Sequence, residues 1–148
     1  MVIRNSIKGI IIKETKLLVN KLRYEGDIMY TLPGGKQESD ELMLDALKRE
    51  VMEETGFIVE PRSLLFIREG FRNHTDEPDV HRIEFMFICD IVSDAGKNFI
   101  EYDEHQIGVH WLNIDNILYE PLYPENMRQV IKNYYLGKSS PIYLGEMK

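Results

Sequence analysis

Three glutamates lie close together in residues 49–56, which read REVMEETG. Glu50, Glu53 and Glu54 have the i, i+3, i+4 spacing that makes side chains neighbours on a helix, where like charges repel. The only lysine inside the helix predicted here, Lys48, points away from them on a helical wheel. Grouped carboxylate oxygens suit a hard divalent cation such as Mg²⁺, which is normally shared between protein carboxylates and substrate phosphates. The spacing therefore predicts a magnesium site.

A helix must position these carboxylates. The sequence predicts that it is capped by Ser39 or Asp40, runs to Thr55 and stops at Gly56. At about 100° per residue, its apolar stripe faces the core and the glutamates lie on the adjoining face. The core stripe is predicted at Leu44, Leu47 and Val51.

Strand-type patterns lie on both sides of this helix. Residues 6–13 and 16–24 read as a hairpin, and the sequence PGG at 33–35 is expected to break a short strand at 28–32. Three further strands are expected at 57–71, 80–92 and 107–114, and a last helix at 124–137. This order predicts an α/β (α+β) fold in which a mixed central sheet lies between helices.

Length and composition narrow the class of protein. The 148 residues, 43% hydrophobic and 29% charged, predict one soluble globular domain spanning 1–148. No run of 18 apolar residues predicts a membrane span, and no signal-peptide pattern is present, so the cytoplasm is the expected location. The net charge of −7 argues against non-specific nucleic-acid binding. Cys89, in an apolar run, is expected to be a buried, inert thiol.

A longer pattern surrounds the glutamates. From Gly35 the chain reads glycine, five residues, Glu41, seven residues, then REVMEETGF. This pattern resembles the signature of the Nudix hydrolases at its fixed positions, and only Phe57 is aromatic where an aliphatic residue is usual. The preceding LPGG and the later VHWLNIDNI are also similar to family surroundings. The resemblance implies a Nudix-type α/β/α sandwich.

The resemblance also implies an activity. Nudix enzymes use a divalent metal, Mg²⁺ or in some cases Mn²⁺, to hydrolyse a phosphoanhydride bond in a nucleoside diphosphate linked to another group. By the resemblance, metal-activated water attacks, and Arg49 orients the glutamates. Glu53 and Glu54 are then catalytic as well as metal ligands. The metal ligands implied for this sequence are the carbonyl of Gly35 and the carboxylates of Glu50, Glu53 and Glu54.

A further base is expected from the acidic segment EYDEHQIGVHW at 101–111. Many Nudix enzymes take such a glutamate from a loop ahead of a late strand, and Glu104, the acidic residue nearest the strand, is our choice. Glu101, Asp103 and the signature glutamates remain alternatives for this role. Candidate contacts to the anionic substrate carry no specific signal beyond their charge. They are Arg23, Lys36, Arg68 and Arg82.

Residues downstream of the signature bear on the choice of substrate. The position that carries proline in the ADP-ribose group of the family holds Arg72, and residues 73–75 lack the tyrosine of the diadenosine polyphosphate group. These absences favour a nucleoside triphosphate or another small-molecule nucleotide derivative. The alternative function is a Nudix-fold module that binds a nucleotide without turnover, and the complete glutamate set favours the enzyme. Both a monomer and a homodimer fit the sequence.

Overall fold

A computed structural model describes residues 2–72 and 80–146. Two α-helices, two short 3-10 helices and eight strands make up this part of the chain. In chain order they are β1 (Val2–Lys13), β2 (Lys16–Tyr24), β3 (Asp27–Thr31), β4 (Gly34–Lys36), α1 (Met43–Thr55), β5 (Phe57–Arg72), β6 (Val80–Asp94), η1 (Lys97–Phe99), β7 (Gln106–Asn113), η2 (Ile114–Tyr119), α2 (Met127–Tyr135) and β8 (Tyr143–Glu146).

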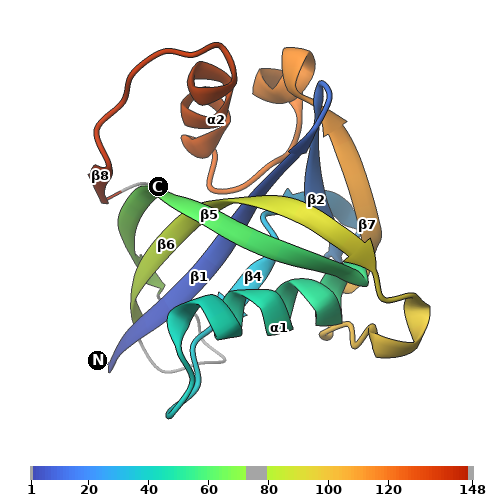
Figure 1. Ribbon diagram of the computed structural model, residues 1–148. Helices are drawn as coiled ribbons and strands as arrows, with labels where there is room; N and C mark the ends of the chain where they lie inside the picture. Colours follow the sequence, from blue (N-terminus) through green and yellow to red (C-terminus); the bar gives the residue numbers. More distant parts are fainter. Residues whose placement is uncertain (1, 73–79, 147–148) are drawn as a thin grey trace.

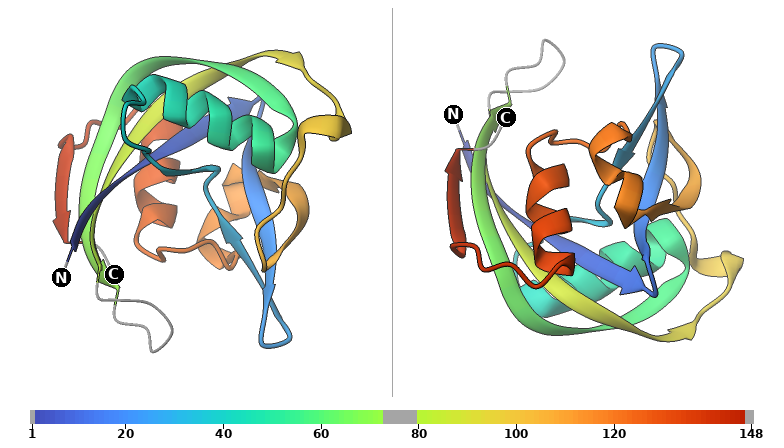
Figure 2. Two further views of the ribbon diagram at one scale, coloured as in Figure 1. Left: turned by 90° about the horizontal axis from the view of Figure 1, so that it is seen from below. Right: turned by 90° about the horizontal axis from the view of Figure 1, so that it is seen from above.

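The strands form one mixed sheet in the order β3-β2-β1-β6-β5-β8, with β4 paired to β1 and β7 paired to β2. The β1–β6 and β5–β8 pairs are parallel and the other pairs are antiparallel. Helix α1 covers one face of the curved sheet and α2 lies on the other (Figures 1 and 2). The predicted α/β/α sandwich with a mixed central sheet is confirmed.

Each face of the sheet has its own hydrophobic core. On the α1 side, the buried residues are Ile7, Ile11, Leu18, Ala46, Leu47, Val51, Val59 and Cys89. The core on the α2 side is larger and includes Ile10, Leu17, Phe66, Met86, Leu112 and Ile131. The predicted burial of Cys89 is confirmed, and this burial raises the pKa of its thiol to about 12.

The helix that carries the glutamates ends where the sequence predicts and begins later. Gly56 adopts a left-handed conformation, with φ 79°, and its N–H donates to the carbonyl of Met52. The expected cap at Ser39 or Asp40 is wrong, because the N-cap is Leu42 and uses no side-chain hydrogen bond. Asp40 instead has a φ of 65°, which belongs to a turn and not to a helix start.

The predicted core stripe of α1 is correct for Leu47 and Val51 and wrong for Leu44, which is 40% exposed. The fully buried Ala46 takes part in the core instead. On the wheel, Ala46 and Leu47 flank the directions of Glu50 and Glu54, so the face directed at the sheet includes these glutamates. The carboxylates therefore lie partly beneath the helix, and not only beside its apolar stripe.

Several elements were not predicted. Residues 33–35, expected to break a strand, contribute to β4, and its pairing with β1 fixes the loop before the helix. The short edge strand β8 and the helix η2 also lack a clear sequence pattern. Helix α2 begins three residues after the expected position 124. None of the helices within the described ranges is long and apolar enough to cross a membrane.

Candidate active site

Arg49 forms hydrogen bonds with several of the acidic side chains. Its Nε donates to Glu41 Oε2 at 2.7 Å, and its Nη1 donates to Glu50 Oε1 at 3.1 Å and Glu53 Oε2 at 3.4 Å. The hydrogen bond from Arg49 holds the pKa of Glu41 below its ordinary range. One guanidinium group therefore contacts three of the signature glutamates.

Glu54 points the other way, into the junction of β2, β4 and β7. Its Oε2 accepts a hydrogen bond of 2.5 Å from Asn20 Nδ2, and the Gly34 N–H lies 3.3 Å from both carboxylate oxygens. Gln106 Nε2 donates to the Glu54 carbonyl at 3.0 Å and lies 3.4 Å from Asn20 Oδ1. Burial raises the pKa of Glu54 to about 7, although Lys8 and Asn20 act in the opposite direction.

Gly35 allows β4 to pass directly over Glu50. A Cβ atom at residue 35 would lie 2.7 Å from the carboxyl carbon of Glu50, closer than real Cβ contacts allow. Burial raises the pKa of Glu50, and the neighbouring Arg49 lowers it. A side chain at residue 35 would therefore displace the Glu50 carboxylate from its place beside β4.

The carboxylate oxygens are suitable ligands for a divalent cation, but their present positions do not form a coordination site. In the described ranges, no group of three or more acidic, histidine or cysteine side chains is already gathered as a metal site. Glu50 and Glu53 are held by Arg49, while the raised pKa of Glu54 reflects a carboxylate that lacks full charge compensation. A bound cation would supply that compensation, and small side-chain rotations would have to bring the oxygens together.

A cavity of about 340 Å³ lies on the α2 side of the sheet, and Glu50, Glu53 and Glu54 are not in its lining. Lys8 lies in its wall, and Lys8 Nζ donates to the carbonyls of Leu32 at 3.4 Å and Gly34 at 3.2 Å. Since the N–H of Gly34 bonds Glu54, one residue joins the cavity wall to the glutamates. The cavity lining is Lys8, Met29, Thr31, Leu32, Arg68, Arg82, Glu84, Met86, Tyr123, Pro124 and Met127.

The predicted substrate contacts divide into two groups. Arg68 and Arg82 line the cavity, and Arg68 forms a buried ion pair with Glu84, with Nη2 and Oε2 2.8 Å apart. Arg23 and Lys36 are exposed on β2 and β4 and do not line it. The structure therefore brings two of the four predicted contacts to the cavity.

The acidic segment 101–104 lies at the end of α1, where the Glu101 N–H donates to the Glu53 carbonyl at 2.7 Å. Asp103 has a structural contact, because its Oδ1 accepts from the N–H groups of His105 and Gln106, each at 3.2 Å. Glu104 is exposed. The segment is therefore adjacent to the glutamate cluster, with Asp103 occupied by backbone hydrogen bonds.

Three residues of this site were missed at the sequence level: Lys8, Asn20 and Gln106. Asn20 and Gln106 are only 6% and 7% exposed, and a buried amide requires hydrogen-bond partners. The signal for Asn20 was present, since it interrupts the apolar run LLV in a predicted strand. The partners of all three depend on which strands become neighbours.

Comparison with known proteins gives a consistent result. The sequence model of the NUDIX domain matches residues 4–134. An ADP-ribose pyrophosphatase from Methanocaldococcus jannaschii is 34% identical over 137 residues, which are 90% of this chain and 74% of that protein. An 8-oxo-dGDP phosphatase from Danio rerio is 30% identical over 99 residues, but the aligned part is 67% of this chain and only 28% of that relative's length.

The fold agrees with these matches. A solved NUDIX hydrolase from Nitrosomonas europaea superposes with a TM-score of 0.72 and 25% identity, covering 94% of this chain and 93% of that one. The signature from Gly35 to Phe57 lies inside the matched range and forms the loop and helix described above. The chain belongs to the NUDIX family of hydrolases.

Proposed function

We propose that the chain is a divalent-metal-dependent pyrophosphohydrolase that cleaves the phosphoanhydride bond of a nucleoside diphosphate linked to another group. The observation that supports this most directly is that Gly34 contacts both a cavity residue and a signature glutamate. Its N–H donates to Glu54 and its carbonyl accepts from Lys8, which lines the 340 Å³ cavity. A substrate bound in that cavity would have its phosphates close to the glutamates.

The charges of the cavity support an anionic substrate. Lys8, Arg68 and Arg82 contribute three positive charges, and Glu84 contributes one negative charge. This local excess of positive charge is opposite in sign to the net charge of −7 on the whole protein. The apolar side chains of Met29, Leu32, Met86 and Met127 provide surface for a base or a sugar.

The roles of individual residues follow from their contacts. Glu50, Glu53 and Glu54, with the carbonyl of Gly35, would hold Mg²⁺ or Mn²⁺. When bound, such an ion neutralises phosphate charge and lowers the pKa of water. Arg49 holds two of these carboxylates in position and anchors to Glu41, which is itself bonded to the Glu38 N–H.

We assign the abstraction of the proton from the attacking water to Glu104. This exposed carboxylate belongs to the segment whose backbone is bonded to the end of α1, and it makes no contact that would hold it in another role within the described ranges. Catalysis by a positioned carboxylate contributes roughly 10²–10⁴-fold.

Substrate identity can be narrowed only to a class. The two relatives above are named for ADP-ribose and for 8-oxo-dGDP, and both compounds are nucleoside diphosphate derivatives. Residue 72 is Arg72 and not the proline of the ADP-ribose group, and this difference argues against ADP-ribose as the substrate. We therefore propose a nucleoside diphosphate derivative or a nucleoside triphosphate as substrate.

The test is a screen of such compounds with Mg²⁺ and with Mn²⁺, with products identified by mass. We expect a nucleoside monophosphate and a phosphorylated remainder, and we expect EDTA to stop the reaction. Glu53→Gln serves as the control that separates this activity from a contaminant. No turnover of any compound, combined with measurable binding, would instead favour a module that binds nucleotides without cleaving them.

A further inference from the structure

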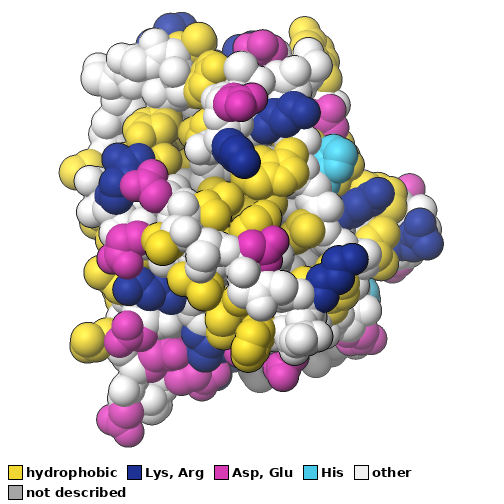
Figure 3. Space-filling view, turned by 45° about the vertical axis from the view of Figure 1, so that its right-hand side comes forward, with side chains coloured by type: hydrophobic (Ala, Val, Ile, Leu, Met, Phe, Trp, Pro, Cys, Tyr) yellow, Lys and Arg dark blue, Asp and Glu magenta, His cyan; other side chains and the backbone are white. Residues whose placement is uncertain are grey.

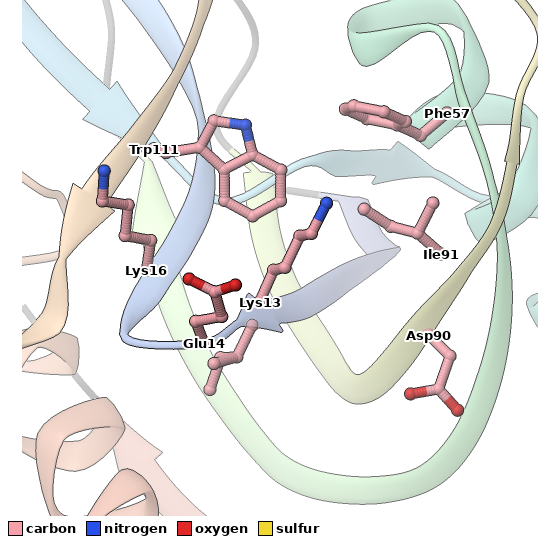
Figure 4. A pocket seen from close by; sticks show the side chains of 8 residues that line it. Lys13, Glu14, Lys16, Phe57, Asp90, Ile91 and Trp111 are labelled. Carbon is pink, nitrogen blue, oxygen red and sulfur yellow. The ribbon is translucent and has the colours of Figure 1, made fainter.

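A second and larger cavity, of about 690 Å³, lies at the other end of the hairpin formed by β1 and β2. It shares no lining residue with the cavity near the glutamates. Figure 4 shows Lys16 and Lys13 on either side of the Trp111 ring, with Phe57 and Ile91 across the cavity from Trp111. Its size falls within the range of roughly 300–1,000 Å³ that is usual for small-molecule sites.

Two lysines close to the hairpin turn line this cavity. Lys13 and Lys16 are direct cross-strand partners on either side of the hairpin turn, so their side chains project from the same face of the ribbon. Like charges placed directly opposite each other destabilise a sheet. Neither lysine forms an ion pair with Glu14, or with any other carboxylate in the described ranges.

Two acidic residues, Glu14 and Asp90, also line this cavity. Asp90 also lines the cavity, but its Oδ2 lies 2.7 Å from Arg62 Nε, so Arg62 already neutralises it. Glu14 is held in the turn with a φ of 58°. The lining therefore carries two positive charges, on Lys13 and Lys16, and two negative charges, on Glu14 and Asp90, of which Asp90 is paired with Arg62 outside the lining.

The walls of the cavity are aromatic and partly exposed. Trp111 and Phe57 meet edge to face, with ring centroids 6.2 Å apart, and both remain partly accessible. The indole N–H of Trp111 makes no hydrogen bond within the ranges that the structure describes, which leaves a donor for a ligand. On the face of the molecule in Figure 3, hydrophobic side chains likewise lie among lysine and arginine side chains.

We propose that this cavity is a second binding site, for a planar aromatic anion such as a nucleoside monophosphate. The aromatic ring lies against Trp111 and Phe57, as bases stack on aromatic side chains in many proteins. The anionic group lies between Lys13 and Lys16, where it relieves their repulsion. This binding does not depend on cleavage at the glutamate site.

The only tryptophan of the chain provides the readout. AMP is titrated into the protein in EDTA, and the fluorescence of Trp111 is followed. We expect a saturable change below about 5 mM AMP. Adenosine lacks the charged phosphate, and ribose 5-phosphate lacks the aromatic ring. Because each keeps only one of the two interactions, each should bind at least about tenfold more weakly than AMP.

Variants distinguish this cavity from the other one. Lys13→Ala/Lys16→Ala should raise the Kd for AMP about tenfold or more, and Lys13→Arg/Lys16→Arg should restore it. The matched control is Lys97→Ala/Lys138→Ala, which removes two exposed lysines outside both cavities. Arg82→Ala, in the cavity near the glutamates, should also leave the fluorescence titration unchanged.

Three results would overturn the proposal. The first is the absence of any saturable change with AMP in this range. The second is a titration that Lys13→Ala/Lys16→Ala leaves as in the wild type, with folding verified by circular dichroism. The third is a titration abolished by Arg82→Ala, because the signal would then come from the other cavity. Each of these results leaves the proposed hydrolase activity untouched.

Discussion

The removal of the Glu54 charge should stabilise the metal-free protein, and the gain should grow with pH. Burial raises the pKa of Glu54 to about 7 in the folded chain, against an ordinary value of 4.5. The contribution of Glu54 to the free energy of unfolding of the wild type is therefore most favourable below pH 4.5. It decreases as the pH rises toward 7. Glu54→Gln lacks this titration, and its amide oxygen can still accept from Asn20.

The size of the effect follows from the two pKa values. At pH 8 the carboxylate is ionised in the folded and the unfolded chain, so its burial costs the wild type roughly 3 kcal/mol. At pH 5 the folded form is mostly protonated, and the cost falls to about 1 kcal/mol. Between pH 5 and pH 8, the free energy of unfolding of Glu54→Gln should thus gain about 2 kcal/mol relative to the wild type.

Urea unfolding in EDTA at several pH values, followed by the fluorescence of Trp111, measures this difference. The matched control is Glu41→Gln, which also removes one charge from the site. Because the hydrogen bond from Arg49 lowers the pKa of Glu41, its carboxylate is ionised throughout pH 5–8, and the difference from the wild type should stay flat. A flat difference for Glu54→Gln, or one that falls with pH, would refute the argument from burial.

Three further predictions follow from the site. Glu104→Gln should lower kcat by roughly 10²–10⁴-fold with little change in KM, and a near-normal kcat would exclude Glu104 as the base. Asn20→Ala, which removes the donor to Glu54, should weaken Mg²⁺ binding about 10–100-fold in calorimetry without substrate, and unchanged affinity would contradict the positioning role. Gly34→Ala should destabilise the protein by more than about 2 kcal/mol, because φ is +131° and the added Cβ would lie 2.0 Å from the carbonyl oxygen of Ile7. Gly108→Ala, with no atom within 4 Å of the added Cβ, is its control, and equal melting temperatures of the two variants would contradict the clash.

Local features of the site could be predicted from the sequence because they depend on neighbours along the chain. The i, i+3, i+4 spacing places Glu50, Glu53 and Glu54 on one side of a helix wherever that helix is found. Gly56 ends the helix because a glycine adopts the left-handed conformation without a Cβ clash. The hairpin of β1 and β2 follows from alternating strand patterns joined by a two-residue turn.

The start of α1 could not be predicted in the same way. Ser39 and Asp40 are good caps by residue type, yet the helix begins at Met43. Glu41, which lies before the first helical residue, accepts hydrogen bonds from Arg49, eight residues later in the chain. A long-range ion pair thus overrides a local capping preference.

The environment of the glutamates was decided only by the tertiary structure. Sequence spacing places the three side chains together, but it does not show that Glu54 turns toward Asn20 while Glu50 and Glu53 bond Arg49. That difference exists because β2 and β4 pass beneath the last turns of α1. The 340 Å³ cavity likewise requires β1 to pair in parallel with β6, which brings Lys8 and Arg82 to one face from positions far apart in the sequence. Periodicity along a chain specifies the faces of each element, whereas the neighbours of each face are set by the burial of both hydrophobic cores at once.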